Sequence, residues 1–207
     1  MPTSTQADFA GLLTSYLWVC GVLFALVVAL VALLLVRSRA GRPAPPSRTA
    51  SHRASAIGLI ALVAIAAFLI TRTFSVEGRE DSLAASTAVR VDAIAFQWGW
   101  EFDYAGTSIR VIGLPSHTPT LVLPAGKTVE IRLRSRDVLH SFWVPALRFK
   151  RDAFPDQATR FDIQVPLGLQ RGECALYCGL HHAEMRFDVR GVDDAHWASF
   201  LAGEPAT

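Results

Sequence analysis

The sequence predicts an all-β sandwich or barrel preceded by a two-helix transmembrane hairpin. Apolar residues are concentrated before residue 72 of the 207-residue chain, whereas most charged residues follow it. Two long apolar runs in that first part predict helices that cross a membrane. Beyond residue 88, short runs alternate between apolar and polar side chains and are separated by turns rich in Gly and Pro, which is typical of β-strands.

The first apolar run predicts a transmembrane helix at about residues 12–36. This run contains no charged side chain, and about 25 residues are enough to cross a bilayer. A cleaved signal peptide is the alternative. However, Arg37 and Arg39 follow the run instead of preceding it, and no small-x-small cleavage pattern stands after it.

A second apolar run predicts a second spanning helix at about residues 54–72. Its length is near the lower limit for a span, and a buried core helix is the alternative, but its closeness to the first run favours a hairpin. Residues 37–53 between the runs contain five arginines, three prolines and no acid. The positive-inside rule therefore predicts a cytoplasmic loop, with both termini on the outer side of a bacterial-type plasma membrane. Residues 1–74 form the predicted membrane anchor.

Residues 75–88 are polar and unpatterned, and we expect a linker there. Residues 89–207 form the predicted extracytoplasmic domain, closed by a short helix at about 193–201 with Asp193 as its cap. From residue 72 onward the chain has 15 basic and 17 acidic residues, and it lacks a basic groove with interleaved aromatics, which excludes nucleic acid as a partner. The expected strands are 89–95, 109–112, 120–123, 128–133, 138–144, 160–165 and 185–189.

Soft metal ligands gather near the end of the chain. Cys174, Cys178, His182 and Met185 fall within about a dozen residues, and such ligands select copper or other thiophilic metals. The spacing also fits one face of a helix, but the glycines in this stretch and the strands around it favour a loop between two strands. A single blue-copper ion would need one Cys, and zinc does not normally recruit Met, whereas each thiolate could bridge two copper ions.

The site needs a second imidazole from elsewhere. His140 lies in a predicted strand, 34 residues before Cys174; a His in an apolar strand is usually a core residue, so spacing alone leaves its role open. A disulfide between Cys174 and Cys178 is a further alternative outside the cytoplasm, but it leaves the neighbouring ligands unexplained. Weaker candidates are His52, His117, His181 and His196.

Four segments, in this order, resemble subunit II of cytochrome c oxidase, the subunit of haem-copper oxidases that carries the binuclear copper centre CuA. They are Phe96-Gln97-Trp98-Gly99-Trp100, Asp137-Val138-Leu139-His140-Ser141-Phe142-Trp143-Val144-Pro145, the inter-ligand loop Phe149–Pro155, and the Cys-x3-Cys-x3-His-x2-Met pattern of residues 174–185. The resemblance covers essentially residues 12–200. It implies a cupredoxin-like sandwich or barrel in the second part of the chain.

The resemblance also implies the roles of individual residues. Cys174 and Cys178 would bridge two copper ions. One ion would be completed by His140 and Met185, and the other by His182 and the backbone carbonyl of Leu176. Trp98 would be the residue through which electrons enter, although strand packing is an alternative role for this side chain.

The function implied is that of the electron-accepting subunit of a terminal oxidase, a cytochrome-c oxidase whose complete active site is not on this chain. It would take electrons from cytochrome c and pass them to haem in subunit I, where oxygen is reduced with proton pumping. Subunit I, cytochrome c and membrane lipid are the expected partners. The alternatives are a CuA-type subunit of a membrane nitric oxide reductase and a membrane-tethered copper chaperone, which would bind one copper and would not need Met185.

Two departures from the family pattern stand out. Leu176 occupies the position of a usual Glu whose carboxylate reaches a magnesium shared with subunit I, so the resemblance does not extend to that magnesium. Many members also have a Glu near the start of the second helix for proton uptake, whereas residues 50–60 contain no acid. We therefore expect a different proton route.

Overall fold

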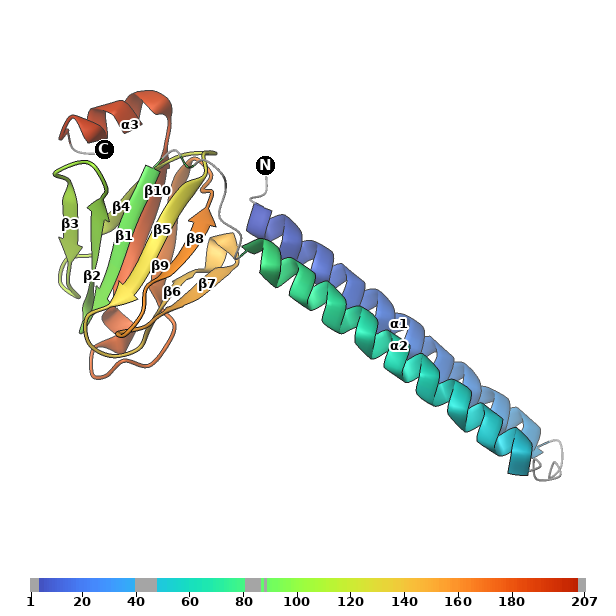
Figure 1. The fold of residues 1–207 in the computed structure, drawn as a ribbon. Helices are drawn as coiled ribbons and strands as arrows, with labels where there is room; N and C mark the ends of the chain where they lie inside the picture. Colours follow the sequence, from blue (N-terminus) through green and yellow to red (C-terminus); the bar gives the residue numbers. More distant parts are fainter. Residues whose placement is uncertain (1–3, 40–47, 81–86, 88, 205–207) are drawn as a thin grey trace. The chain divides into compact units, whose positions relative to one another are not determined.

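The computed structural model describes residues 4–39, 48–80, 87 and 89–204. The chain divides into two compact units (Figure 1). One is helical and contains Phe9–Glu77, and the other contains the β-domain, which lies within Gly78–Thr207.

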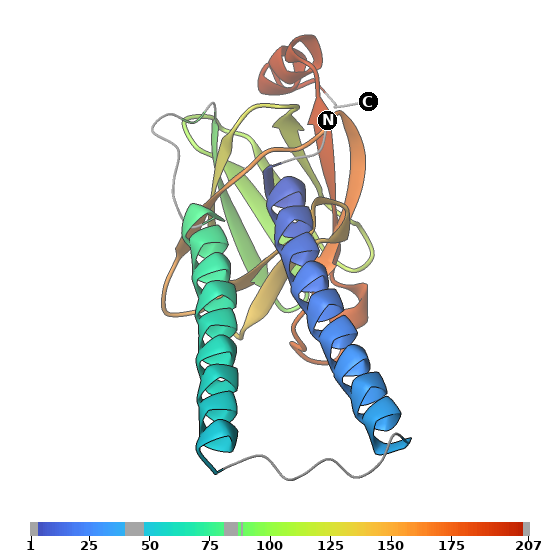
Figure 2. The same ribbon diagram turned by 90° about the vertical axis from the view of Figure 1, so that its right-hand side faces the viewer.

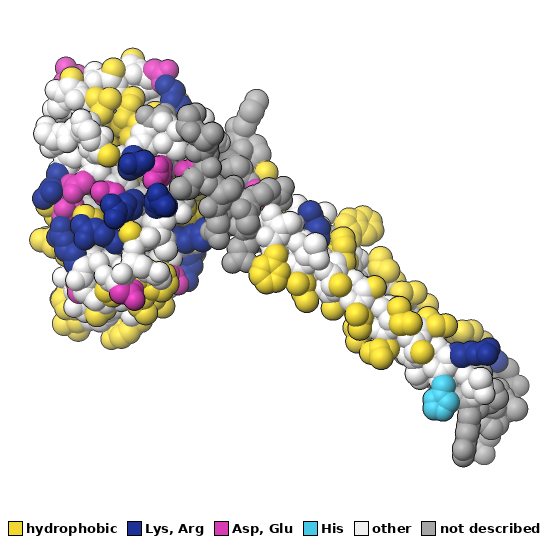
Figure 3. All heavy atoms as spheres, viewed as in Figure 1, with side chains coloured by type: hydrophobic (Ala, Val, Ile, Leu, Met, Phe, Trp, Pro, Cys, Tyr) yellow, Lys and Arg dark blue, Asp and Glu magenta, His cyan; other side chains and the backbone are white. Residues whose placement is uncertain are grey.

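The helical unit consists of α1 (Ser4–Arg39) and α2 (Arg48–Glu80), two antiparallel helices (Figures 1 and 2). Tyr16 Oη and Thr73 Oγ1 are 2.7 Å apart and join the helices by a hydrogen bond. Ala7–Arg39 and His52–Val76 are long and apolar enough to cross a membrane. In the most apolar 18-residue segment of each helix, no residue is buried within the structure. The exposed side chains along both helices are mainly apolar (Figure 3). Such a surface suits lipid, because a helix satisfies its own backbone hydrogen bonds there.

Both helices extend beyond the predicted apolar spans. α2 already begins at Arg48, inside the predicted loop, and continues to Glu80, so the first part of the predicted linker is helical. Apolar composition marks only the stretch that suits a membrane, whereas helical hydrogen bonding continues through polar residues. The rest of the predicted loop, at 40–47, and most of the linker, at 81–86 and 88, lie outside the described residues.

The β-domain is a sandwich of two five-stranded sheets, as the sequence predicts (Figures 1 and 2). The strand orders are β3-β2-β1-β5-β8 and β4-β10-β9-β6-β7. Neighbouring strands are antiparallel except for the pairs β1–β5 and β4–β10. The strands are β1 (Val89–Phe96), β2 (Gly99–Tyr104), β3 (Arg110–Gly113), β4 (Thr120–Pro124), β5 (Val129–Ser135), β6 (His140–Val144), β7 (Phe149–Ala153), β8 (Thr159–Ile163), β9 (Gly168–Cys174) and β10 (Arg186–Val192).

Aromatic side chains fill the space between the sheets. Phe187 lies at the centre, stacked on Phe142 at 4.6 Å and edge-on to Trp100 at 4.9 Å between ring centroids. A Cβ at Gly172 would stand 2.3 Å from the Phe187 ring, so only glycine fits at this point of β9. This packing fixes β9 and β10, the two strands that flank the cysteine loop.

Three strands, β2, β7 and β9, were not predicted. In β2 nearly every residue is buried, and β9 combines two glycines with three polar side chains, so neither shows an alternating pattern. β7 is an edge strand with charged residues at its centre; the loop expected at 149–155 is therefore largely strand. Two short 3-10 helices, η1 (Pro145–Leu147) and η2 (His182–Glu184), and a C-terminal helix, α3 (Asp194–Leu201), complete the domain. Asp193 caps α3 by accepting a hydrogen bond from the backbone N–H of His196 at 2.9 Å.

Candidate metal centre

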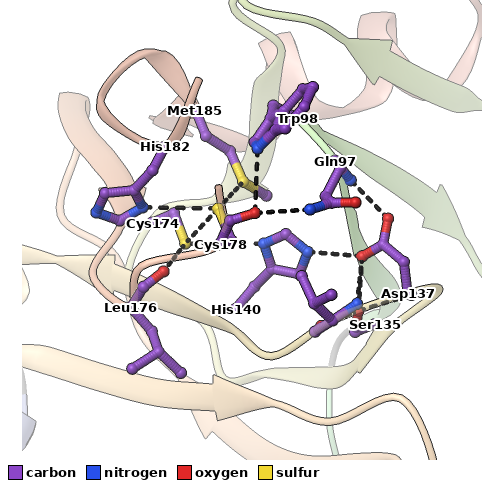
Figure 4. Close-up of polar contacts among 11 residues, drawn as sticks. Gln97, Trp98, Ser135, Asp137, His140, Cys174, Leu176, Cys178, His182 and Met185 are labelled. Atoms are coloured by element: carbon purple, nitrogen blue, oxygen red, sulfur yellow. Dashed lines mark hydrogen bonds and ion pairs between the residues drawn. The ribbon is translucent and has the colours of Figure 1, made fainter. Parts of the chain in front are cut away.

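Three segments far apart in the sequence meet at one end of the β-domain (Figure 4). The turn between β1 and β2 contributes Gln97 and Trp98. The segment that enters β6 contributes Asp137 and His140. The loop from the end of β9 to the start of β10, residues 174–185, contributes the sulfur ligands.

The two cysteines of this loop form the centre of the cluster. Cys174 and Cys178 are 5% and 4% exposed, and their Sγ atoms are 3.9 Å apart. Both are free thiols, because a disulfide requires a separation of about 2.05 Å. Two adjacent buried thiols, without a bond between them, could share a thiophilic cation.

Further donor atoms surround the thiols. The Nδ1 of His140, the Sγ of Cys174 and the Sγ of Cys178 belong to a group whose donor atoms all lie within 4.8 Å of one another. Every ligand expected from the sequence is therefore close to a cysteine sulfur. His140 Nδ1 and Leu176 O are 3.8 and 3.2 Å from Cys174 Sγ, and His182 Nδ1 and Met185 Sδ are 3.6 and 3.7 Å from Cys178 Sγ.

Local backbone structure explains why the stretch forms a loop. β9 ends at Cys174, whose backbone N–H donates to Met185 O at 3.0 Å and so closes the base of the loop. Gly179 has a φ of 119°, which side-chain-bearing residues rarely adopt and which no helix contains. Cys174, Cys178, His182 and Met185 therefore do not lie along one face of a helix. The loop brings their side chains together around the two cysteine sulfurs.

Asp137 orients the His140 ring. Its Oδ1 accepts hydrogen bonds from His140 Nε2 at 2.8 Å and from the backbone N–H of Val138 at 2.7 Å, and its Oδ2 accepts one from the backbone N–H of Gln97 at 2.7 Å. With the proton on Nε2, the Nδ1 lone pair faces Cys174. Carboxylates commonly orient metal-binding histidines in this way.

The two thiols differ in acidity. Burial raises the pKa of Cys174, but hydrogen bonds, first among them that of His140, outweigh it and hold the pKa at about 7. Burial, together with the negative charge of Cys174, raises the pKa of Cys178 to about 12. In the metal-free pair Cys174 is therefore the thiol that ionises first, close to neutral pH, while Cys178 keeps its proton. Binding of a cation would favour loss of the second proton.

Trp98 is half-buried and contacts the loop directly. Its Nε1–H donates to the backbone carbonyl of Cys178 at 3.2 Å, and its ring meets that of His181 edge-on at 5.0 Å. His181 itself pairs with Glu184 at 3.5 Å. The other weak candidates lie on separate elements: His52 on α2, His117 beyond β3 and His196 on α3.

Two residues at the site were not singled out as functional from the sequence. They are Asp137, three residues before His140, and Gln97, immediately before Trp98. Both stand inside segments that carry the family resemblance. Hydrogen-bonding side chains next to predicted ligands were the signal available for finding them.

The donor set fits copper. Two thiols, two imidazoles, a thioether and a carbonyl form a soft, largely buried set, whereas a hard cation such as magnesium needs oxygen ligands. Leu176 offers only its carbonyl oxygen, which lies 3.2 Å from Cys174 Sγ.

Comparison with known proteins agrees with this chemistry. Residues 110–192 match the family described as cytochrome C oxidase subunit II, periplasmic domain. The probable cytochrome c oxidase subunit 2 of Mycobacterium leprae is 29% identical over 196 residues, covering 66% of this chain and 56% of that protein. The β-domain belongs to the cytochrome c oxidase subunit II family. A cytochrome c oxidase subunit 2 of Mycobacterium tuberculosis is 36% identical over 100 residues, covering 45% of this chain and 28% of that protein. The chain thus spans only part of the length of these subunit II proteins.

A solved structure shows the same fold. The periplasmic domain of cytochrome oxidase subunit II from Bradyrhizobium japonicum has a TM-score of 0.53 at 24% identity, covering 58% of this chain and 96% of that one. A second structure, a mixed-disulfide intermediate between a thioredoxin-like protein and a subunit II domain, has a TM-score of 0.52 at 25% identity, covering 59% and 95%. The predicted cupredoxin-like fold is confirmed. The two apolar helices and the likeness of the β-domain to periplasmic domains indicate a membrane protein with an extracytoplasmic domain.

Proposed function

We propose that this chain is the electron-accepting subunit of a membrane-bound terminal oxidase. It would receive electrons from cytochrome c and pass them to haem in subunit I, where oxygen is reduced with proton pumping. One observation carries the proposal: the buried Cys174 and Cys178 thiols, 3.9 Å apart, lie among the donors of His140, His182 and Met185 in a subunit II fold. When bound, a thiolate-bridged copper pair would take up and release one electron with little change in geometry.

The residues of the chain have separate tasks in this proposal. Cys174 and Cys178 would hold both copper ions; His140 and Met185 would complete the ligands of one ion, and His182 with the Leu176 carbonyl those of the other. Burial of Cys174, Cys178 and Met185 keeps water from the sulfur atoms. Asp137 holds the His140 ring in place through its hydrogen bond to Nε2.

Trp98 is proposed as the residue through which electrons enter. It is partly exposed, so a donor protein can reach its ring. Its indole N–H is bonded to the carbonyl of Cys178, a proposed bridging ligand. A single side chain thus connects the surface to the site.

We also propose the membrane topology. Residues 1–74 would form the anchor, the arginine-rich loop would face the cytoplasm, and the termini and the domain of residues 89–207 would lie outside. A membrane-impermeant thiol reagent should then label a cysteine introduced at position 204 in intact cells, in a chain whose native cysteines are replaced by serine. Labelling only after cell lysis would contradict this topology.

Copper loading tests the proposed function. The reduced full-length chain in detergent should bind two copper ions, and electron paramagnetic resonance should show one unpaired electron shared by both. A Cys174→Ser variant, which retains size but lacks the thiolate, should lose the shared signal. One isolated Cu(II) ion per chain would instead support a copper chaperone, and Met185→Leu would then leave binding unchanged. Turnover of oxygen against nitric oxide by the purified complex separates an oxidase from a nitric oxide reductase.

A further inference from the structure

We infer that Gln97 is a positioning residue that ties the two halves of the candidate metal centre together and holds the Trp98 indole against Cys178. The positioning role rests on hydrogen bonds within this chain and does not depend on a bound metal. Their consequence for electron transfer rests on the function proposed above.

Gln97 is hydrogen-bonded to both ligand-bearing segments. Its backbone N–H donates to Asp137 Oδ2 at 2.7 Å, and Asp137 Oδ1 in turn accepts from His140 Nε2 at 2.8 Å. Its side-chain Nε2 donates to the carbonyl of Cys178 at 2.7 Å. One residue of the β1–β2 turn therefore links the segment of His140 to the cysteine loop, and its amide points toward the centre of the site (Figure 4).

The Cys178 carbonyl is a shared acceptor. Gln97 Nε2 donates to it at 2.7 Å and Trp98 Nε1 at 3.2 Å, so both lone pairs of this oxygen have partners. The shorter bond comes from Gln97. Gln97 therefore holds the Cys178 carbonyl in the position where it can accept the Trp98 indole N–H.

Gly179 makes this double contact possible. A Cβ at this position would lie 3.1 Å from Trp98 Cζ2 and 3.2 Å from both Gln97 Nε2 and Trp98 Nε1. These distances are tighter than ordinary van der Waals contact, so a side chain would push both donors away from the carbonyl. The absence of a side chain at Gly179 therefore leaves room for both hydrogen bonds to the Cys178 carbonyl.

Removing the Gln97 donor should loosen the indole contact. Gln97→Met has nearly the same shape and length but no N–H group, so it keeps the packing and loses the bond. The net value of one hydrogen bond predicts a rise of about three- to tenfold in the solvent exchange of the Trp98 indole proton. The matched control is Gln164→Met, because Gln164 Nε2 makes an equivalent bond of 2.9 Å to Thr128 Oγ1.

The experiment uses the full-length, metal-free chain in detergent micelles with 15N-labelled indoles. The chain has five tryptophans, and Trp98→Phe identifies the signal of Trp98. The proposal requires faster exchange of that proton in Gln97→Met and no change in Gln164→Met. Unchanged exchange in Gln97→Met would overturn it, because only the packing of Gln97 would then matter. Gly179→Ala should reproduce the faster exchange while Gln97 is intact.

Copper-loaded protein supplies an independent readout. Gln97→Met should shift the midpoint potential and slow electron transfer from cytochrome c about three- to tenfold, whereas Gln164→Met should change neither. A wild-type chain that binds no copper pair would refute the proposed function, but the indole exchange would still decide the role of Gln97. An indole that loosens in Gln97→Met with an unchanged potential and transfer rate would overturn the electron-transfer part alone.

Discussion

The His140 ring donates a hydrogen bond from Nε2 to Asp137 Oδ1 at 2.8 Å, while its Nδ1 lies 3.8 Å from Cys174 Sγ. His140 is fully buried, whereas the Asp137 side chain is 31% exposed. Burial alone would lower the pKa of His140, but the hydrogen bonds with Cys174 and Asp137 raise it above its ordinary value. The carboxylate therefore decides which nitrogen faces the thiols.

Loss of this carboxylate should weaken metal binding. Asp137→Asn keeps the size of the side chain but removes its charge and one acceptor, so the His140 ring is no longer held with Nδ1 toward the sulfur. We expect copper affinity to fall about ten- to a hundredfold, as measured by competition with a chelator. Asp193→Asn is the control, because Asp193 makes a similar contact of 2.7 Å with His196 on α3. Equal affinities for both variants and the wild type would contradict the assigned role of Asp137.

The side chain of Leu176 should be dispensable for the metal. Only its carbonyl, 3.2 Å from Cys174 Sγ, is proposed as a ligand. Leu176→Ala should therefore leave the copper stoichiometry and spectrum unchanged, with a loss of about 1 kcal/mol in unfolding free energy from reduced apolar burial. His182→Ala, which removes a side-chain ligand, should change the spectrum. A changed spectrum in Leu176→Ala would show that its side chain shapes the site.

The Tyr104 hydroxyl joins the two sheets. It donates to Val122 O at 3.0 Å and accepts from Val122 N–H at 2.8 Å, connecting β2 to β4 within the buried core. Tyr104→Phe leaves both backbone groups without this partner and should cost about 1–3 kcal/mol of unfolding free energy in chemical denaturation. Tyr177→Phe, at a side chain 77% exposed, should change stability by less than about 0.5 kcal/mol. Similar losses in both variants would argue against the cross-sheet tie.

The same hydroxyl should make stability fall at alkaline pH. Burial raises the pKa of Tyr104 well above its ordinary value of 10.0, an effect that the backbone hydrogen bond with Val122 only partly offsets. Below pH 10 the hydroxyl is neutral in both states. As the pH rises past 10, the unfolded chain ionises first and is favoured, so the wild type loses stability. Denaturation at pH 8 and pH 10.5 should show a smaller loss in Tyr104→Phe; an equal loss would refute this explanation.

A side chain at Gly172 of β9 should destabilise the β-domain. A Cβ at Gly172 would stand 2.3 Å from the Phe187 ring, and overpacking of this kind costs about 1–3 kcal/mol. Gly172→Ala should lower the unfolding free energy of the β-domain accordingly, followed by near-ultraviolet circular dichroism. Gly58→Ala on α2, where nothing lies within 4 Å, should leave that transition unchanged. A stable Gly172→Ala domain would mean that the Phe187 ring can move aside.

The sequence by itself predicted the two apolar helices and the soft ligands of the cysteine loop, whereas His140 and the Leu176 carbonyl were expected only from the family resemblance. An uncharged run such as residues 12–36 has one stable form in lipid, a helix, because its backbone must satisfy its own hydrogen bonds there. The ligands of the cysteine loop are close in the chain, and their softness is a property of the side chains. Alternation in β1, β5 and β8 is equally local, so these strands could be read before any fold was known.

Only the tertiary structure decided which distant residues meet. The approach of His140 to Cys174 depends on the pairing of Phe142 with Cys174 between β6 and β9. β9 contains two glycines and three polar side chains, and its sequence has no strand pattern of its own. The hydrogen bonds of Gln97 to Asp137 and to Cys178 join three segments. In each bond one partner is a backbone group, the N–H of Gln97 or the carbonyl of Cys178, and such groups are the same in nearly every residue. Backbone donors and acceptors carry no signal in the sequence, so contacts that use them become visible only when the sheets have brought the segments together.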